Sequence, residues 1–470
     1  MKSRFAMVLA CCTALAFGAG CDDDPKENNN NVNNVNNVNN ANNVNNVNNV
    51  NNVNNVNNVN NVNNVNNVNN INNTNNTNNQ PGATRNVDVV LVVDTSMSMA
   101  DEQVVLAQNL PTLLAPLRQI TGGLPNLHVG TLTPDLGAAP FNLPGCEADG
   151  DGGRFLKGEA NACANPVNQT YVVDVEPRGC TIEKDPGSDG PVTCLSHTCD
   201  QTHCDAAAFS DGVGGDPTEP DGLTLVEDEG GCPRCRNYAE ETLDQVVACM
   251  AGLGTGGCGF EQPLEALMTA LDAGPEDNLG FLRDDALLVV VLVTDEDDCS
   301  ASNPELFNPE GDLASTLGPI SSFRCTEFGV VCDEPWQRVM AEPPMTYHNC
   351  VPRPEGDVQS LLHPVERYTA FLQTLKGSGA VITAVIAGPY DNTLMVDTDE
   401  MNKPFLLPSC GSIDANNAQP AVRLRHFVNL LTPVTADLEW AFYPICGADF
   451  TSALTGVAEK VRAALEAAAQ

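Results

Sequence analysis

The sequence contains few basic and few aromatic residues. It has 22 Lys and Arg against 61 Asp and Glu, for a formal net charge of −39, and only 5% of its residues are aromatic. A chain this acidic repels the phosphates of nucleic acids and the surfaces of anionic lipids, so we expect no nucleic-acid binding. Most of the carboxylates are interpreted as a solvated acidic surface.

Common catalytic motifs are absent too. The chain has no Gly-x-Ser-x-Gly, no phosphate-binding loop and no His-Glu-x-x-His. Its six histidines are scattered, and His128 and His426 are interpreted as packing or surface residues. We therefore do not expect an enzyme.

No apolar run is long enough to span a membrane stably. The run from Phe5 to Gly20 follows two basic residues, which is the layout of a secretory signal peptide over residues 1–20. It ends in Gly-Ala-Gly-Cys21, which resembles a bacterial lipoprotein signal and implies an acylated Cys21, with 21–27 as the anchor segment. The protein is then exported and lipid-anchored in the bacterial cell envelope, at the outer membrane or cell surface. Ordinary cleavage after Gly20 is the alternative.

Residues 28–80 repeat the triplet Asn-Asn-Val. A period of three fits neither a helix nor a strand, and the segment has too little apolar surface to offset the entropy of ordering. We expect a disordered tether with its ends about 40 Å apart, and at most roughly 175 Å when stretched. Asparagine-rich tracts can also aggregate as β structure, which is the alternative.

The cysteines are even in number once the signal peptide and Cys21 are set aside. Sixteen remain between Cys146 and Cys446, and in an exported protein they are predicted to form disulfides. There are two alternatives to structural disulfides. One is redox chemistry at the motif Cys232-Pro-Arg-Cys235, and the other is zinc binding by the His and Cys residues at 197–204. Local spacing suggests two pairs: Cys249 with Cys258, and Cys325 with Cys332.

A strand-like run of Val and Leu leads directly into oxygen-bearing side chains. Residues 87–93 suit a strand buried on both faces, and Asp94, Ser96 and Ser98 follow it. Ligands bind outside the carboxyl ends of such strands, and one carboxylate with two hydroxyls suits Mg²⁺. The alternative is an ordinary helix start, with Ser98 or Asp101 as the cap.

The pattern Asp-x-Ser-x-Ser resembles the metal-ion-dependent adhesion site of von Willebrand factor A (vWA) domains. A second buried run, 286–293, ends in Thr-Asp295, so the resemblance implies that Asp295 is a further ligand. It also implies Thr255 as the ligand of the middle loop. Three more acids follow Asp295, and extra acid beside the metal could tighten binding or admit Ca²⁺.

The resemblance implies an α/β fold, with a doubly wound, mostly parallel sheet flanked by helices over residues 81–470. Two Cys-rich irregular insertions interrupt it, at about 140–237 and 299–360. The expected helices are 101–117, 238–251, 261–271, 365–375 and 450–464, and the expected strands are 87–93, 127–133, 286–293, 380–387 and 440–445, with 170–175 as an edge strand.

The function implied by the resemblance is metal-dependent protein binding. The two aspartates and neutral oxygens leave a position on Mg²⁺ open, with Ca²⁺ or Mn²⁺ as other candidate ions, and an exposed Asp or Glu of a protein partner fills it. The chain is similar to the adhesin lipoproteins of gliding bacteria, and the membrane is contacted only through the lipid anchor. A periplasmic assembly or scaffold protein is the alternative. In integrin-type relatives the closing helix slides on binding, a motion that a disulfide at Cys446 would prevent.

Overall fold

The computed structural model describes the chain from residue 85 to residue 468, with gaps. Residues 1–20, which are predicted to be a signal peptide, Cys21 and the Asn-Asn-Val repeat lie outside the described residues, so the expectations for them stay predictions. No helix in the described part is long and apolar enough to cross a membrane. The described ranges are 85–185, 190–210, 222–272, 274–377, 379–412, 415–432, 439–447 and 449–468.

The core of the fold is a mixed sheet of eight strands. Five neighbouring strands are parallel, in the order β17 (Phe442–Pro444), β12 (Val381–Ala387), β8 (Leu287–Val293), β1 (Asn86–Val93) and β2 (Asn126–Leu132). Every residue of β1 is buried, as expected for a run of Val and Leu covered on both faces. The chain moves from β1 to β2, then returns to the other side of β1 with β8. The sheet is therefore doubly wound, with its switch point between β1 and β8.

The other three strands come from the first insertion. They continue the sheet beyond β2 as β3 (Val172–Val175), β7 (Pro233–Arg236) and β6 (Thr224–Glu227), each antiparallel to its neighbour. The sequence predicted the 170–175 strand at an edge, and this is wrong because β7 and β6 pair beyond it. The sheet is parallel in its first five strands and antiparallel in the rest.

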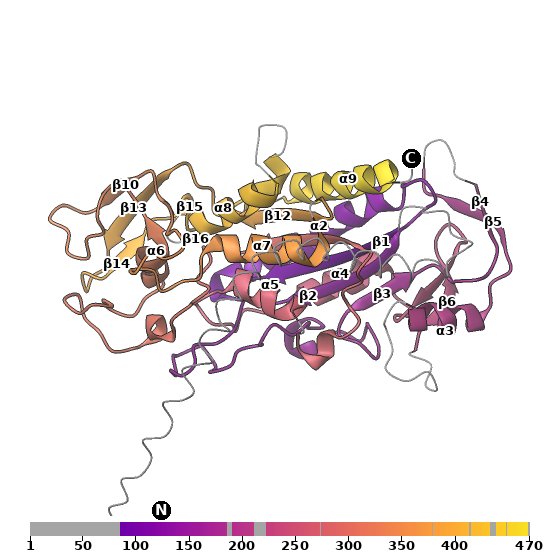
Figure 1. Ribbon diagram of the computed structural model, residues 1–470, viewed down its shortest axis with the longest axis horizontal. Helices are drawn as coiled ribbons and strands as arrows, with labels where there is room; N and C mark the ends of the chain where they lie inside the picture. The colour runs from indigo at the N-terminus through magenta and orange to yellow at the C-terminus, as the bar shows by residue number, and fades with distance from the viewer. Residues whose placement is uncertain are drawn as a thin grey trace, which may run out of the picture. The chain divides into compact units, whose positions relative to one another are not determined.

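Helices cover both faces of the sheet (Figure 1). Residues of β1 alternate between two cores, with Val89 and Leu91 facing one and Val90 and Val92 the other, as the period of two in a strand requires. The first core is covered by α2 (Ala100–Leu117), α4 (Leu243–Ala251) and α9 (Thr451–Ala468), and the second by α5 (Pro263–Leu271), α7 (Val365–Lys376) and α8 (Val422–Leu431).

The remaining elements belong to the two insertions. The second insertion continues beyond its predicted end at 360, because a strand at 345–348 pairs with one at 393–398. The first insertion holds β4 (Ile182–Asp185), β5 (Thr193–His197) and α3 (Gln201–Ser210). The second insertion holds α6 (Phe323–Gly329), β9 (Val330–Val331), β10 (Met345–His348), β11 (Val351–Pro352), β13 (Thr393–Thr398), β14 (Pro404–Leu406), β15 (Cys410–Ser412) and β16 (Ala415–Ala418).

Disulfides hold the insertions to the sheet domain. All sixteen cysteines pair, which confirms the disulfide prediction. No free thiol is left at Cys232 or Cys235 for redox chemistry, or at Cys199 or Cys204 for zinc. Both predicted local pairs are wrong, because the loops fold back onto cysteines distant in sequence. The pairs are Cys146–Cys258, Cys163–Cys249, Cys180–Cys199, Cys194–Cys232, Cys204–Cys235, Cys299–Cys325, Cys332–Cys350 and Cys410–Cys446.

A buried ion-pair network joins two of the added strands, β3 and β7, and Arg234 of this network also donates to the Leu124 and Pro125 carbonyls just before β2. Asp174 on β3 accepts a hydrogen bond from Arg234 Nε at 2.6 Å, and Arg236 Nε lies 3.0 Å from its other oxygen. The Tyr238 hydroxyl donates to the same carboxylate at 2.5 Å. Burial alone would raise the pKa of Asp174, but the two arginines outweigh it and hold the pKa below its usual value. The added strands β3 and β7 are thus held together by charge as well as by backbone hydrogen bonds.

Replacing Asp174 by Asn tests this network. The change leaves two guanidinium groups without a counter-charge in a buried site, so we expect the free energy of unfolding to fall by about 3–5 kcal/mol. The matched control, Asp244→Asn, breaks a partly exposed pair with Arg118 and should cost less than about 1 kcal/mol. Guanidinium chloride unfolding of the oxidised protein measures both, and equal losses would contradict the assignment.

Candidate metal-binding site

The candidate site lies where β1 and β8 end side by side. Val93 pairs with Val293 in the sheet, and the Asp94 N–H donates to the Val293 carbonyl at 2.9 Å. The carboxyl ends of parallel strands meet at one edge, and the winding of the chain reverses here, which leaves a crevice. The loops after the two strands therefore carry Asp94 and Asp295 to the same place.

Three oxygen atoms of these loops have separations that suit one cation. Ser96 Oγ lies 3.1 Å from Ser98 Oγ and 3.5 Å from Asp295 Oδ1. Neighbouring ligands of an octahedral ion are about 3.0 Å apart for Mg²⁺ and about 3.3–3.7 Å apart for Ca²⁺. Ser96 and Asp295 are buried whereas Ser98 is exposed, so the group opens to solvent on the side of Ser98.

Asp94 is fully buried and ties the two loops together. Its Oδ1 accepts a hydrogen bond from the Ser96 N–H at 2.6 Å, and its Oδ2 accepts one from the Thr294 hydroxyl at 2.6 Å. In the described structure no side chain caps α2 or the short helix η4 (Met97–Met99) ahead of it. The helix-cap interpretation of Ser98 and Asp101 is therefore wrong.

Only one of the three acids after Asp295 faces this crevice. Asp298 pairs with Arg423 at 2.9 Å, and Asp297 accepts backbone N–H groups from the first turn of α8. Glu296 is half-buried and lies beside Asp94. Of the run of acids in the sequence, two serve to fix α8 and one adds charge to the site.

The middle loop is held against the β1 loop by its backbone. The Gly257 N–H donates to the Thr95 carbonyl at 2.9 Å, and Gln103 Nε2 donates to the Gly254 carbonyl at 2.7 Å. Thr255 lies in this loop, half-exposed. In the described structure its hydroxyl makes no hydrogen bond to the other four predicted ligands. Its role as a ligand stays a prediction.

Glu261 is a site residue that sequence reasoning missed. It lies two positions before α5, is 1% exposed, and its Oε1 has no hydrogen-bond partner in the described structure. Its carboxyl group lies within hydrogen-bonding reach of Glu296 and close to Asp94. The one sequence feature that could have identified Glu261 is its position between a Gly-rich loop and a helix that begins with proline. The same feature is also typical of an ordinary helix start.

The carboxyl groups of the site raise one another's pKa. Burial, then Asp94 and then Glu296 raise the pKa of Asp295 to about 8, and burial followed by Asp94 raises the pKa of Glu296 to about 7. Burial and then Glu296 raise the pKa of Glu261 well above its usual value. Among the described residues, no lysine or arginine pairs with these four groups. Crowded buried acids without a counter-charge behave in this way, and a cation would supply that charge.

Cation affinity should therefore depend on pH. A proton must leave Asp295 before it can bind a metal, and the loss of a proton from Glu296 adds negative charge beside the ion, so we expect Mg²⁺ affinity to rise between about pH 6 and about pH 8.5. Isothermal titration calorimetry in buffers of different ionisation enthalpy measures both the affinity and the protons released. An affinity that does not change over this range would contradict the coupling of these acids to the ion.

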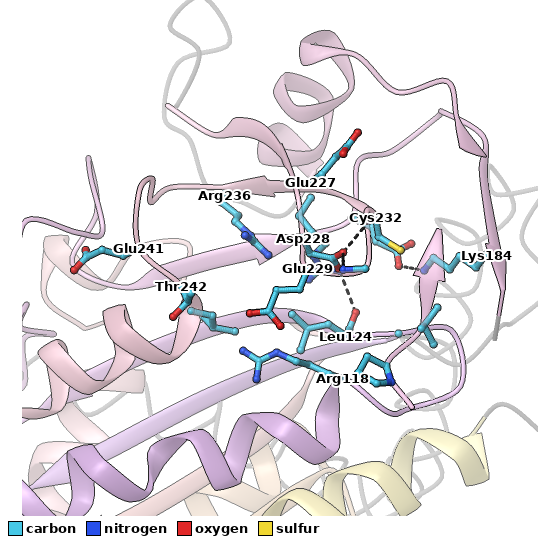
Figure 2. A pocket seen from close by; sticks show the side chains of 17 residues that line it. Arg118, Leu124, Lys184, Glu227, Asp228, Glu229, Cys232, Arg236, Glu241 and Thr242 are labelled. Atoms are coloured by element: carbon cyan, nitrogen blue, oxygen red, sulfur yellow. Dashed lines mark hydrogen bonds and ion pairs between the residues drawn. The ribbon is translucent and has the colours of Figure 1, made fainter. Parts of the chain in front are cut away.

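A separate cavity of about 230 Å³ lies at the opposite edge of the sheet. Leu124 lines it and precedes β2, so the cavity is at the amino ends of the parallel strands (Figure 2). Arg118 pairs with Asp244 at 2.6 Å, and Lys184 pairs with Glu176. These basic groups are already compensated, and none of the sequence-predicted site residues lines this cavity.

Comparisons with known proteins do not assign the chain to a family. No protein-family model, no curated protein and no solved structure matches the chain. The described residues also hold no group of three or more His, Cys, Asp or Glu side chains placed to hold a metal. A cation at this site therefore depends on the two serine oxygens as well as on the carboxylates.

Proposed function

We propose that the protein is a cell-envelope lipoprotein whose vWA-like domain binds a protein partner through a divalent cation. The observation that carries the proposal is the approach of Ser96 Oγ to Ser98 Oγ and to Asp295 Oδ1, at 3.1 and 3.5 Å. These atoms meet at the switch point of a doubly wound sheet, in the order along the chain that the vWA pattern has. The family assignment is part of the proposal.

The chemistry follows from the charge of these ligands. Asp94 and Asp295 neutralise a dication, and the serines add neutral oxygens, which together are fewer than the six ligands that Mg²⁺ takes. Water fills the open positions, and a partner's Asp or Glu replaces one water. Met97 stands between the two serines and is 84% exposed, so it offers the partner an apolar contact beside the ion. Mg²⁺ is the proposed cofactor, and Ca²⁺ or Mn²⁺ would also suit oxygen ligands.

Partner capture tests the proposal. Immobilised protein should retain a protein from envelope extract in the presence of Mg²⁺ and lose it with a chelator, and Asp94→Ala should abolish retention. Asp277→Ala is the matched control, because Asp277 is an exposed acid in the short helix Glu276–Asn278 and is not one of the predicted ligands. Retention that survives both the chelator and Asp94→Ala would contradict the proposal.

The location of the protein is part of the same proposal. Eight disulfides support an exported protein, since such bonds persist in oxidising compartments. Cys21→Ser should move the protein from the membrane fraction to the soluble fraction, as measured by fractionation and immunoblotting. An unchanged distribution would rule out the lipid anchor. Protease treatment of intact cells separates a surface adhesin, which is cleaved, from a periplasmic scaffold, which is protected.

A further inference from the structure

The cavity at the amino ends of the parallel strands contains a basic side chain with unused hydrogen-bond donors. Arg236 on β7 lines it, and Arg236 Nε lies 3.0 Å from Asp174 Oδ2. Among the described residues, the two terminal nitrogens of Arg236 have no hydrogen-bond partner, although each carries two N–H groups. Its neighbour Arg234 donates from all three of its nitrogens. The terminal nitrogens of Arg236 can therefore bind a ligand in the cavity.

The wall of this cavity also carries more positive charge than its nearest acid balances. Arg234 and Arg236 both pair with the single carboxylate of Asp174, and the three side chains are 2%, 14% and 0% exposed. Glu176, another acid in the wall, pairs with Lys184. A carboxylate bound in the cavity would balance the second guanidinium, and the planar fork of an arginine can donate to both of its oxygens.

The rest of the lining indicates what else the ligand carries. Glu229 is exposed, lines the cavity and forms no ion pair within the described part of the chain. Figure 2 shows its side chain and that of Arg236 pointing toward the same part of the cavity. Leu124, Val192 and Leu243 are buried in the same wall and give it an apolar surface. The volume of about 230 Å³ is below the roughly 300–1,000 Å³ of pockets for drug-sized ligands, so the ligand is small.

We propose that this cavity binds a free α-amino acid with an apolar side chain, such as leucine. Its carboxylate accepts from Arg236, its ammonium group donates to Glu229, and its side chain packs on the three apolar residues. A zwitterion suits the mixed lining, because Glu229 repels a simple anion and Arg236 repels a simple amine. The site shares no residue with the predicted metal ligands, so it does not depend on the proposed function.

Isothermal titration calorimetry of the intact, oxidised protein with L-leucine tests the proposal. EDTA is present so that no ion occupies the other site. We expect a dissociation constant below about 1 mM, which is ordinary for so small a ligand. N-acetyl-leucine lacks the ammonium group and leucine methyl ester lacks the carboxylate. Each should bind at least about tenfold more weakly, because a charge-assisted hydrogen bond is lost.

Two variants place the ligand in this cavity. Glu229→Gln should weaken leucine binding at least about fivefold, and Arg236→Lys, which keeps a charge beside Asp174 but removes the planar fork, at least about tenfold. The matched control is Glu276→Gln, because Glu276 is an exposed acid that does not line the cavity. It should bind leucine as the native protein does.

Three results would each overturn the proposal. They are a dissociation constant of the native protein above about 1 mM, an equal affinity for either leucine derivative, and native affinity in either cavity variant. Glu229 is exposed and has no hydrogen-bond partner among the described residues. Glu229→Gln therefore keeps the test valid even if Arg236→Lys fails to fold.

Discussion

The central constraint on this structure is the concentration of buried carboxyl groups between the ends of β1 and β8. Both strands are fixed in register by the sheet, and Asp94 is fully buried between their loops. Asp295, Glu296 and Glu261 lie around it without a basic partner among the described residues. Such an arrangement is unfavourable unless protons or a cation compensate it. The two serines give a cation the additional oxygens that a proton does not need.

The insertions surround this site and hold its loops in place. Disulfides from the first insertion to Cys249 and Cys258 hold the two ends of the middle loop, and Cys299 fixes the segment that follows the β8 loop. Ligand-bearing loops held in this way lose little entropy when an ion or a partner binds. The bond from Cys446 to Cys410 likewise ties the segment just before α9, which opposes a sliding motion of the closing helix.

How much the sequence predicts depends on whether the determining contact is local. The continuous Val and Leu runs of β1 and β8 predict both strands to within about one residue, and with them the meeting of Asp94 and Ser96 with Asp295. Helix α4 begins five residues later than expected, where Thr242 forms a capping box. Helix α8 was not predicted because Arg423 interrupts its apolar face, and only a distant residue, Asp298, explains how that arginine is buried. The disulfide pairs and Glu261 likewise depend on contacts that no local pattern contains.

One measurement addresses the central claim directly. Crystals of the protein soaked in Mn²⁺, which takes the oxygen ligands that suit Mg²⁺, would locate the ion by anomalous scattering at the manganese edge. The account predicts a single strong peak within about 2.5 Å of the Ser96 and Ser98 hydroxyl oxygens, with Asp295 beside it. An empty crevice in well-occupied crystals, or a peak confined to the exposed acidic surface, would contradict it.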